Sequence, residues 1–209
     1  LLTRRNWIMM NKNMNLKKKL IGMFLGLILI FPLPAISADP DELTMVFVPA
    51  SEKGDNQDYV SLIAIIEKLA AVKIKSIRVT DYNAAVESMR AGRAHIAWYG
   101  GKTYIQAAKM AGAEAFAAGV RKGENTAGYY AYFVVRVDSP LKKLEDVKYK
   151  VLGLNSIGST SGDLIPQVEL AKVGLSTKNN DHFSKVFYAG SHDACLLSVI
   201  NRHVDVCGM

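Results

Sequence analysis

Short apolar runs alternate with helix-length amphipathic segments from Leu43 onward. Thr44–Val48 is almost entirely apolar, which is typical of a strand buried on both faces. Residues 58–71 place Leu62, Ile65, Ile66 and Leu69 on one face of a helix. The alternation continues with strands at 73–80, 95–98 and 115–120 and with helices at 82–91 and 102–111. Such a pattern predicts right-handed crossovers and a parallel sheet with helices on both faces.

The alternation changes at Gly128–Val137, where a run of tyrosine and valine is too long and too rich in β-formers for another crossover. We therefore expect residues 129–137 to form a connecting strand between lobe one (39–128) and lobe two (138–209). Lobe two is predicted to contain a short helix ending at 147, strands at 150–154, 185–188 and 204–206, and helices at 164–173 and 194–201. Because the chain ends one strand after the last of these helices, we expect lobe two to be incomplete. The predicted fold class is α/β, with two lobes that each hold a mostly parallel sheet flanked by helices.

Two of the predicted helix starts in lobe two carry hydroxyl and other polar side chains. Residues 159–162 read Ser-Thr-Ser-Gly, and residues 190–193 read Gly-Ser-His-Asp. Unpaired backbone N–H groups and the positive end of the helix dipole make such a start a seat for an anion. A serine there can also simply cap its helix, and for one start alone the cap is the better interpretation. The presence of a second such start, which carries His192 and Asp193, favours the ligand-site interpretation, in which both helix starts converge on one anionic ligand.

The first 38 residues predict export. Lys17, Lys18 and Lys19 precede the apolar run Leu20–Phe31, and the small residues of 34–38 supply a cleavage site, as in a secretory signal peptide. The apolar run is short for a membrane span, which makes an uncleaved anchor the weaker alternative. Met9, Met10 or Met14 is a better initiator than Leu1, so the extreme N-terminus is expected to be an over-extended reading frame.

The positive charge of the chain belongs mostly to this segment. Lysine and arginine number 26 against 19 acidic residues, and six of the basic residues lie in residues 1–38, which leaves 20 basic against 19 acidic side chains. A mature protein with so small a net charge gives no support for nucleic-acid binding.

Other chemistries find little support in the sequence. Cys195 falls in a helix-like run and Cys207 in a strand-like run, so we expect two buried thiols rather than a disulfide, which an oxidising compartment would permit. The histidines lack the spacing of a metal site, and no cofactor is expected. A hydrolase is disfavoured because Thr160 occupies the position of a nucleophile, and because His192 and Asp193 are neighbours whose side chains would diverge.

Several motifs together resemble one family. Asp-Ser-Pro at 138–140 followed by Leu-Glu-Asp-Val at 144–147 is similar to the entry into lobe two of type II periplasmic substrate-binding proteins. The chain from Leu43 to its end further resembles the phosphate/phosphite/phosphonate-binding (PhnD-like) group of ABC-transporter binding proteins. The motifs that carry this likeness are residues 97–100 (Ala-Trp-Tyr-Gly), 159–162 with Pro166, 190–194 and 204–206. The resemblance implies a C-terminally truncated type II fold, capture of a small phosphorus oxyanion in the periplasm, an inner-membrane ABC permease as partner, and a monomer. A sensor domain of a signalling protein with the same fold is the alternative.

The resemblance also implies which residues touch the ligand. It assigns oxyanion contacts to Ser159, Thr160 and Ser161, and further ligand contacts to His192 and Asp193. From lobe one it adds Tyr82, Tyr99 and Tyr129, for which, taken singly, a role as surface or core aromatics is the better interpretation. Asp193 is expected to accept the proton of a P–OH group, which would disfavour sulfate by like-charge repulsion. Gly100-Gly101-Lys102 departs from the Gly-Pro that is commoner in the family after Tyr99.

Overall fold

The computed structural model describes residues 41–50, 55–120, 122–178 and 181–209. All of them belong to the unit Pro40–Met209. The signal peptide predicted for residues 1–38 lies outside the described residues.

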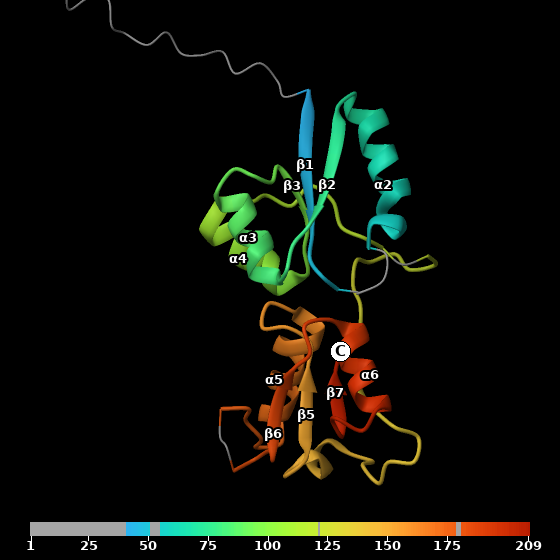
Figure 1. The fold of residues 1–209 in the computed structure, drawn as a ribbon, viewed down its shortest axis with the longest axis vertical. Helices are drawn as coiled ribbons and strands as arrows, with labels where there is room; N and C mark the ends of the chain where they lie inside the picture. Colours follow the sequence, from blue (N-terminus) through green and yellow to red (C-terminus); the bar gives the residue numbers. More distant parts are fainter. Residues whose placement is uncertain (1–40, 51–54, 121, 179–180) are drawn as a thin grey trace, which may run out of the picture. The chain divides into compact units, whose positions relative to one another are not determined.

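The first sheet is parallel and is built from the first three strands. These are β1 (Glu42–Phe47), β2 (Lys73–Arg78) and β3 (Ile96–Trp98), in the order β2-β1-β3. Helix α2 (Asp55–Ala70) lies on one side of this sheet, and α3 (Tyr82–Arg90) with α4 (Gly101–Ala111) lies on the other (Figure 1). We refer to the elements β1 to α4 as the first lobe.

Strand β1 is the centre of this lobe because both of its faces are covered. Phe47 stacks on Tyr59 of α2 with ring centroids 4.4 Å apart. Val46 and Val48, which alternate with Phe47, pack instead with Tyr82 and Ala85 of α3. A central strand buried on two faces needs the continuous apolar run that the sequence provides there.

The second sheet is mixed. It contains β4 (Phe133–Val135), β7 (Val206–Gly208), β5 (Val151–Leu154) and β6 (Lys185–Tyr188), in that order, and only β4 is antiparallel to its neighbour. A 3-10 helix, η1 (Leu144–Val147), precedes β5, and a π-helical turn, η2 (Thr160–Leu164), leads into α5 (Ile165–Lys172). Helix α6 (His192–Ile200) follows β6. We refer to the elements β4 to β7 as the second lobe.

The second sheet also has two covered faces. Leu152, Leu154 and Val206 pack with Leu170 of α5 in one cluster. On the opposite face, Cys195 and Val199 of α6 pack with Val204 and Cys207 in another. A helix therefore lies on each side of β5, as Figure 1 shows for α5 and α6.

Most predicted elements are present, with their ends shifted by a few residues, and β6 occupies the predicted range. The strand predicted at 115–120 is wrong, because residues 112–120 form no helix or strand. Phe116 is 77% exposed and Val120 is 52% exposed. An apolar run becomes a strand only when a neighbouring strand supplies hydrogen bonds, and among the described residues none pairs with this one. Strand β4 covers only the middle of the predicted connecting strand.

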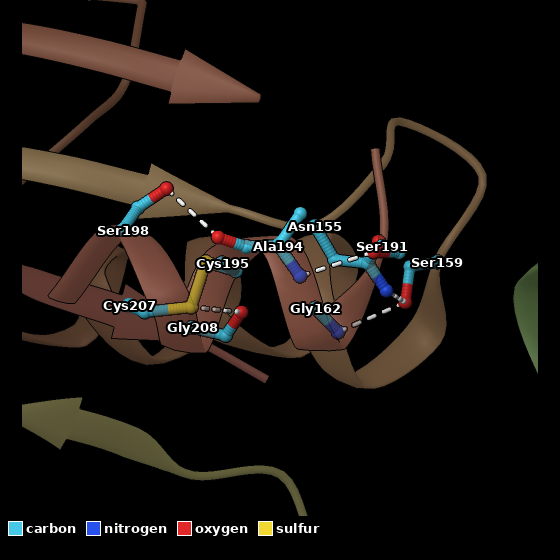
Figure 2. The surroundings of a disulfide bond; sticks show 9 residues. All are labelled: Asn155, Ser159, Gly162, Ser191, Ala194, Cys195, Ser198, Cys207 and Gly208. Carbon is cyan, nitrogen blue, oxygen red and sulfur yellow. Dashed lines mark hydrogen bonds between the residues drawn. A yellow bond between two sulfur atoms is a disulfide. The ribbon is translucent and has the colours of Figure 1, made fainter. Parts of the chain in front are cut away.

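The prediction of two buried thiols is also wrong, since Cys195 and Cys207 form a disulfide with their Cα atoms 6.0 Å apart (Figure 2). The last strand begins at Val206 rather than at Val204, so Cys207 lies within β7. Its side chain thus faces α6, where Cys195 in the first helical turn faces the sheet, and both residues are fully buried. The local pattern of apolar residues does not indicate this register.

The disulfide should contribute measurably to stability. It closes a loop with a sequence separation of 12 residues, so replacing Cys195 and Cys207 together by alanine is expected to lower the free energy of unfolding by about 2–4 kcal/mol. Urea denaturation with and without dithiothreitol measures this. Reductant should destabilise the natural protein and leave the double variant unchanged, whereas equal stability of both proteins in oxidising buffer would contradict the prediction.

Candidate functional site

The segment between β5 and α5, residues 155–163, is the first of two capped helix starts, and we call it the hydroxyl loop. The Ser159 hydroxyl accepts a hydrogen bond from the Gly162 N–H at 3.0 Å, which makes Ser159 the N-cap. A Cβ atom at Gly162 would lie 2.3 Å from the Cβ of Asn155, so only glycine fits there. The helix that follows is π-helical in its first turn and continues as α5.

Helix α6 provides the second start. The Ser191 hydroxyl accepts from the Ala194 N–H at 3.1 Å and caps the helix. His192 is the first helical residue, and its N–H donates to the carbonyl of Ala50 in the segment after β1 at 3.1 Å. The start of α6 is therefore bonded to the first lobe.

Asn155, at the end of β5, joins the two starts. Its N–H donates to the Gly162 carbonyl at 2.9 Å, and its carbonyl accepts from the Gly190 N–H at 2.7 Å. Its side-chain amide reaches the Ser159 hydroxyl at 3.4 Å (Figure 2) and the Tyr82 hydroxyl at 3.4 Å. Asn155 is fully buried. Sequence analysis did not identify it, because one polar residue after an apolar strand carries no distinctive signal.

A cavity of about 840 Å³ opens beside both starts and is lined by residues of both lobes. Of the eight predicted site residues, the following seven line it: Tyr82, Tyr99, Tyr129, Ser159, Thr160, Ser161 and His192. Asp193 is not among the lining residues. Gly100 and Gly101, at the start of α4, also contribute to the lining, although the sequence pattern did not mark either of them as a site residue.

The hydroxyls of the first start differ in what they can offer a ligand. The Oγ1 atom of Thr160 accepts from the Lys102 N–H at 2.9 Å, which leaves the hydroxyl proton of Thr160 to donate. Ser161 is 7% exposed and lines the cavity. Ser159 already accepts the capping bond, so it has only its proton to give. Three hydroxyl donors therefore lie at one helix start, where the dipole favours a negative charge.

The three tyrosines have different environments. Tyr82 is buried and packs on the backbone of Gly158, where a Cβ atom would lie 2.2 Å from the Tyr82 Cβ. The Tyr99 hydroxyl donates to the Ala85 carbonyl at 3.0 Å, and burial raises the pKa of Tyr99 to about 12. The ring of Tyr99 thus lines the cavity, while its hydroxyl is bonded to the backbone of α3. Tyr129 is 53% exposed.

Burial also sets the charge of His192. Desolvation lowers the pKa of His192 from its ordinary value of 6.5, and the neighbouring Asp193 carboxylate opposes that shift. A neutral imidazole at pH 7 has one N–H to donate and one nitrogen to accept. His192 can therefore offer a hydrogen bond to an anion without adding a full charge.

A partly buried ion pair joins α4 to the hydroxyl loop, and the sequence analysis also missed it. The Nζ atom of Lys102 lies 2.5 Å from Oδ2 of Asp163, whose side chain is 1% exposed. The two residues are distant in sequence and lie in different lobes. Their pairing could not be read from local patterns.

Among the described residues no group of three or more His, Cys, Asp or Glu side chains is arranged to hold a metal ion. In the same part of the chain, none of the helices is both long enough and apolar enough to cross a membrane.

Comparison with known proteins identifies the family. Residues 45–209 match the family described as "ABC transporter, phosphonate, periplasmic substrate-binding protein", and the chain belongs to it. This confirms the resemblance inferred from the motifs.

Individual relatives agree with this family. The phosphate-import protein PhnD of Mycolicibacterium smegmatis is 30% identical over 174 residues, which cover 79% of this chain and 54% of the relative. The phosphonates-binding periplasmic protein of Escherichia coli is 30% identical over 161 residues, covering 75% and 46%. The crystal structure of a binding protein component of an ABC phosphonate transporter from Pseudomonas aeruginosa superposes with a TM-score of 0.73 at 25% identity, covering 82% and 57%. The chain thus spans about half the length of the curated relatives it matches.

The lowered pKa of His192 predicts a specific pH dependence of stability. The unfolded chain binds the His192 proton at a higher pH than the folded protein does, so this contribution to stability is complete above pH 6.5 and is lost as pH falls below it. Replacing His192 by glutamine should reduce that loss. Urea denaturation between pH 7.5 and 5 measures this loss of stability. His203→Gln is the matched control, because His203 is an exposed histidine. Identical pH profiles for the natural protein and His192→Gln would contradict the prediction.

Proposed function

We propose that the protein is the periplasmic solute-binding component of an ABC transporter and that it captures a phosphonate, phosphite or phosphate. The observation that carries this proposal is the convergence of two capped helix starts, at Thr160 and at His192, on one cavity with hydroxyl donors. The relatives named above are phosphate-import and phosphonate-binding proteins, which favours transport over a sensing role. A cleavable signal peptide, a permease partner and a monomeric state belong to the same proposal.

The chemistry of the cavity suits a tetrahedral oxyanion. Taking such an anion out of water costs several kcal/mol unless its oxygens accept hydrogen bonds, and each bond to a charged acceptor recovers roughly 1.5–3 kcal/mol. Thr160 and Ser161 supply hydroxyl protons at the positive end of α5, and Ser159 supplies a third. We assign these donors to the anionic oxygens and His192 to a further oxygen.

Asp193 takes an indirect role in this proposal. It does not line the cavity, but its carboxylate interacts electrostatically with His192. A negative charge behind the imidazole disfavours a second full charge on the ligand, and it therefore disfavours sulfate relative to an anion that retains a proton.

Binding is proposed to close the two lobes around the ligand about a hinge in 128–137. Contacts from the second lobe come from the two helix starts, contacts from the first lobe come from Tyr82 and the start of α4, and Tyr129 adds a contact from the connecting segment. A ligand that touches both lobes stabilises the closed arrangement, which the permease can then recognise. We propose binding without chemical turnover, because the site offers donors around an anion and Thr160 stands where a hydrolase would need an activated nucleophile.

Calorimetric titration of the purified mature protein tests the proposal. The panel consists of methylphosphonate, phosphite, phosphate and sulfate. At least one phosphorus oxyanion should bind, remain chemically unchanged, and bind more tightly than sulfate. Failure to bind any of the phosphorus compounds, or tighter binding of sulfate, would overturn the assignment.

Removing donors from the first helix start should affect binding far more than folding. Thr160→Ala combined with Ser161→Ala is expected to weaken binding of that oxyanion by roughly 3–6 kcal/mol if the two contributions add. The free energy of unfolding should fall by only about 1 kcal/mol, because the Ser159 cap is retained and the main loss is the hydrogen bond from the Lys102 N–H to Thr160. Ser198→Ala is the control, since that hydroxyl donates to the Ala194 carbonyl within α6 and does not line the cavity. An unchanged affinity with a large drop in melting temperature would show that both residues are purely structural.

A further inference from the structure

Lys102 in the first turn of α4 contacts the hydroxyl loop at three points. Its backbone N–H donates to Oγ1 of Thr160 at 2.9 Å. Its ammonium group pairs with Asp163 at 2.5 Å and donates to the carbonyl of Ile157. These contacts lie on both sides of the serine and threonine donors, and all of them come from one residue of the opposite lobe.

The neighbouring residues bring α4 close to the loop. The Thr103 hydroxyl donates to the Gly158 carbonyl at 2.8 Å, and Thr103 is fully buried. A Cβ atom at Gly100 would lie 3.0 Å from Oγ1 of Thr160, so a larger residue there would crowd the Thr160 hydroxyl. We call the contacts of Lys102 and Thr103 with the hydroxyl loop the α4 contact.

The positive charge that neutralises the Asp163 carboxylate comes from Lys102, through the α4 contact. Its carboxylate also accepts from the Gln167 amide at 2.5 Å and from the Tyr188 hydroxyl at 2.9 Å. Both of these partners are neutral and belong to the second lobe, whereas the ion pair is made with the first. A buried carboxylate without a counter-charge is strongly unfavourable, because its hydration is lost without replacement.

We propose that Lys102 is a positioning residue that stabilises the closed arrangement of the lobes and orients the Thr160 hydroxyl for the ligand. The inference rests on the proposed function. In the closed arrangement Lys102 neutralises Asp163, and when the lobes separate water can hydrate that carboxylate instead. Separation of the lobes also breaks the hydrogen bond from the Lys102 N–H to Oγ1 of Thr160. Lobe closure and the orientation of the Thr160 hydroxyl are therefore coupled.

The proposal predicts the sign of a double-mutant cycle. Lys102→Met leaves a buried carboxylate uncompensated only in the closed arrangement, so it lowers the population of that arrangement and raises the apparent Kd by about 10- to 100-fold. Asp163→Asn removes the charge that needs compensation. The double variant should therefore bind at least about 5-fold more tightly than Lys102→Met alone, a non-additive result that independent structural damage would not produce.

The experiment measures Kd by calorimetry with methylphosphonate and with inorganic phosphate, and lobe closure by the radius of gyration from small-angle X-ray scattering. Lys102→Met should enlarge the unliganded protein relative to the natural one. Lys172→Met is the matched control, because it breaks an exposed pair with Glu169 at 2.6 Å, and it should change neither quantity. If Lys102→Met does not fold, Lys102→Gln takes its place in the cycle.

The outcomes separate the two proposals. If the natural protein binds neither probe and no other member of the oxyanion panel, the proposed function fails, and the scattering comparison still tests the role of Lys102 in closure. Additive effects in the cycle, or natural affinity and natural dimensions for Lys102→Met, would overturn the inference about Lys102. Recovery of affinity in the double variant together with an enlarged Lys102→Met protein would support it.

Discussion

The backbone of Asn155 is the junction on which the site depends. Its N–H and carbonyl are bonded to Gly162 and Gly190, which belong to the two helix starts of the second lobe. Because the end of β5 is bonded to one residue of each helix start, it fixes the position of both starts relative to the sheet. Because β5 is covered on both faces by helices, the junction sits on a rigid support. The disulfide fixes α6 to β7, so the second start cannot slide along the sheet.

Close approach of backbones is the second condition that the site imposes. Gly158 and Gly162 lie in the hydroxyl loop where a side chain would overlap Tyr82 and Asn155, respectively. Substituting either residue would move the loop away from its support, so these glycines serve packing rather than flexibility. Residues 158–162 of the loop are thus packed against Asn155 and Tyr82, and these contacts fix the positions of the Thr160 and Ser161 hydroxyls.

Local patterns predicted much of this fold, and the failures share one cause. The periodicity of apolar residues located the helices and strands, including β6 with both of its ends. The strand expected at 115–120, the disulfide and the pair of Lys102 with Asp163 all depend on which segments become neighbours. The helix starts and their polar residues could be recognised because a cap is a local feature, and of the cavity residues the three tyrosines could be named only with the help of the family resemblance. Asn155 acts mainly through its backbone, which no pattern of side chains reveals.

Each helix start at the cavity combines an N-cap residue with a following residue that lines the cavity. Asp81, Ser159 and Ser191 each use a side-chain oxygen to cap a helix, and Gly100 occupies the same position before α4. The residues that follow them, Tyr82, Thr160, His192 and Gly101, all line the cavity. A capping side chain turns back to bond an N–H of its own helix, and the residue after it begins the first turn, beside the remaining unpaired N–H groups. Four helix starts from two lobes place such a residue at the cavity, and at three of them a side-chain cap fixes the start of the helix.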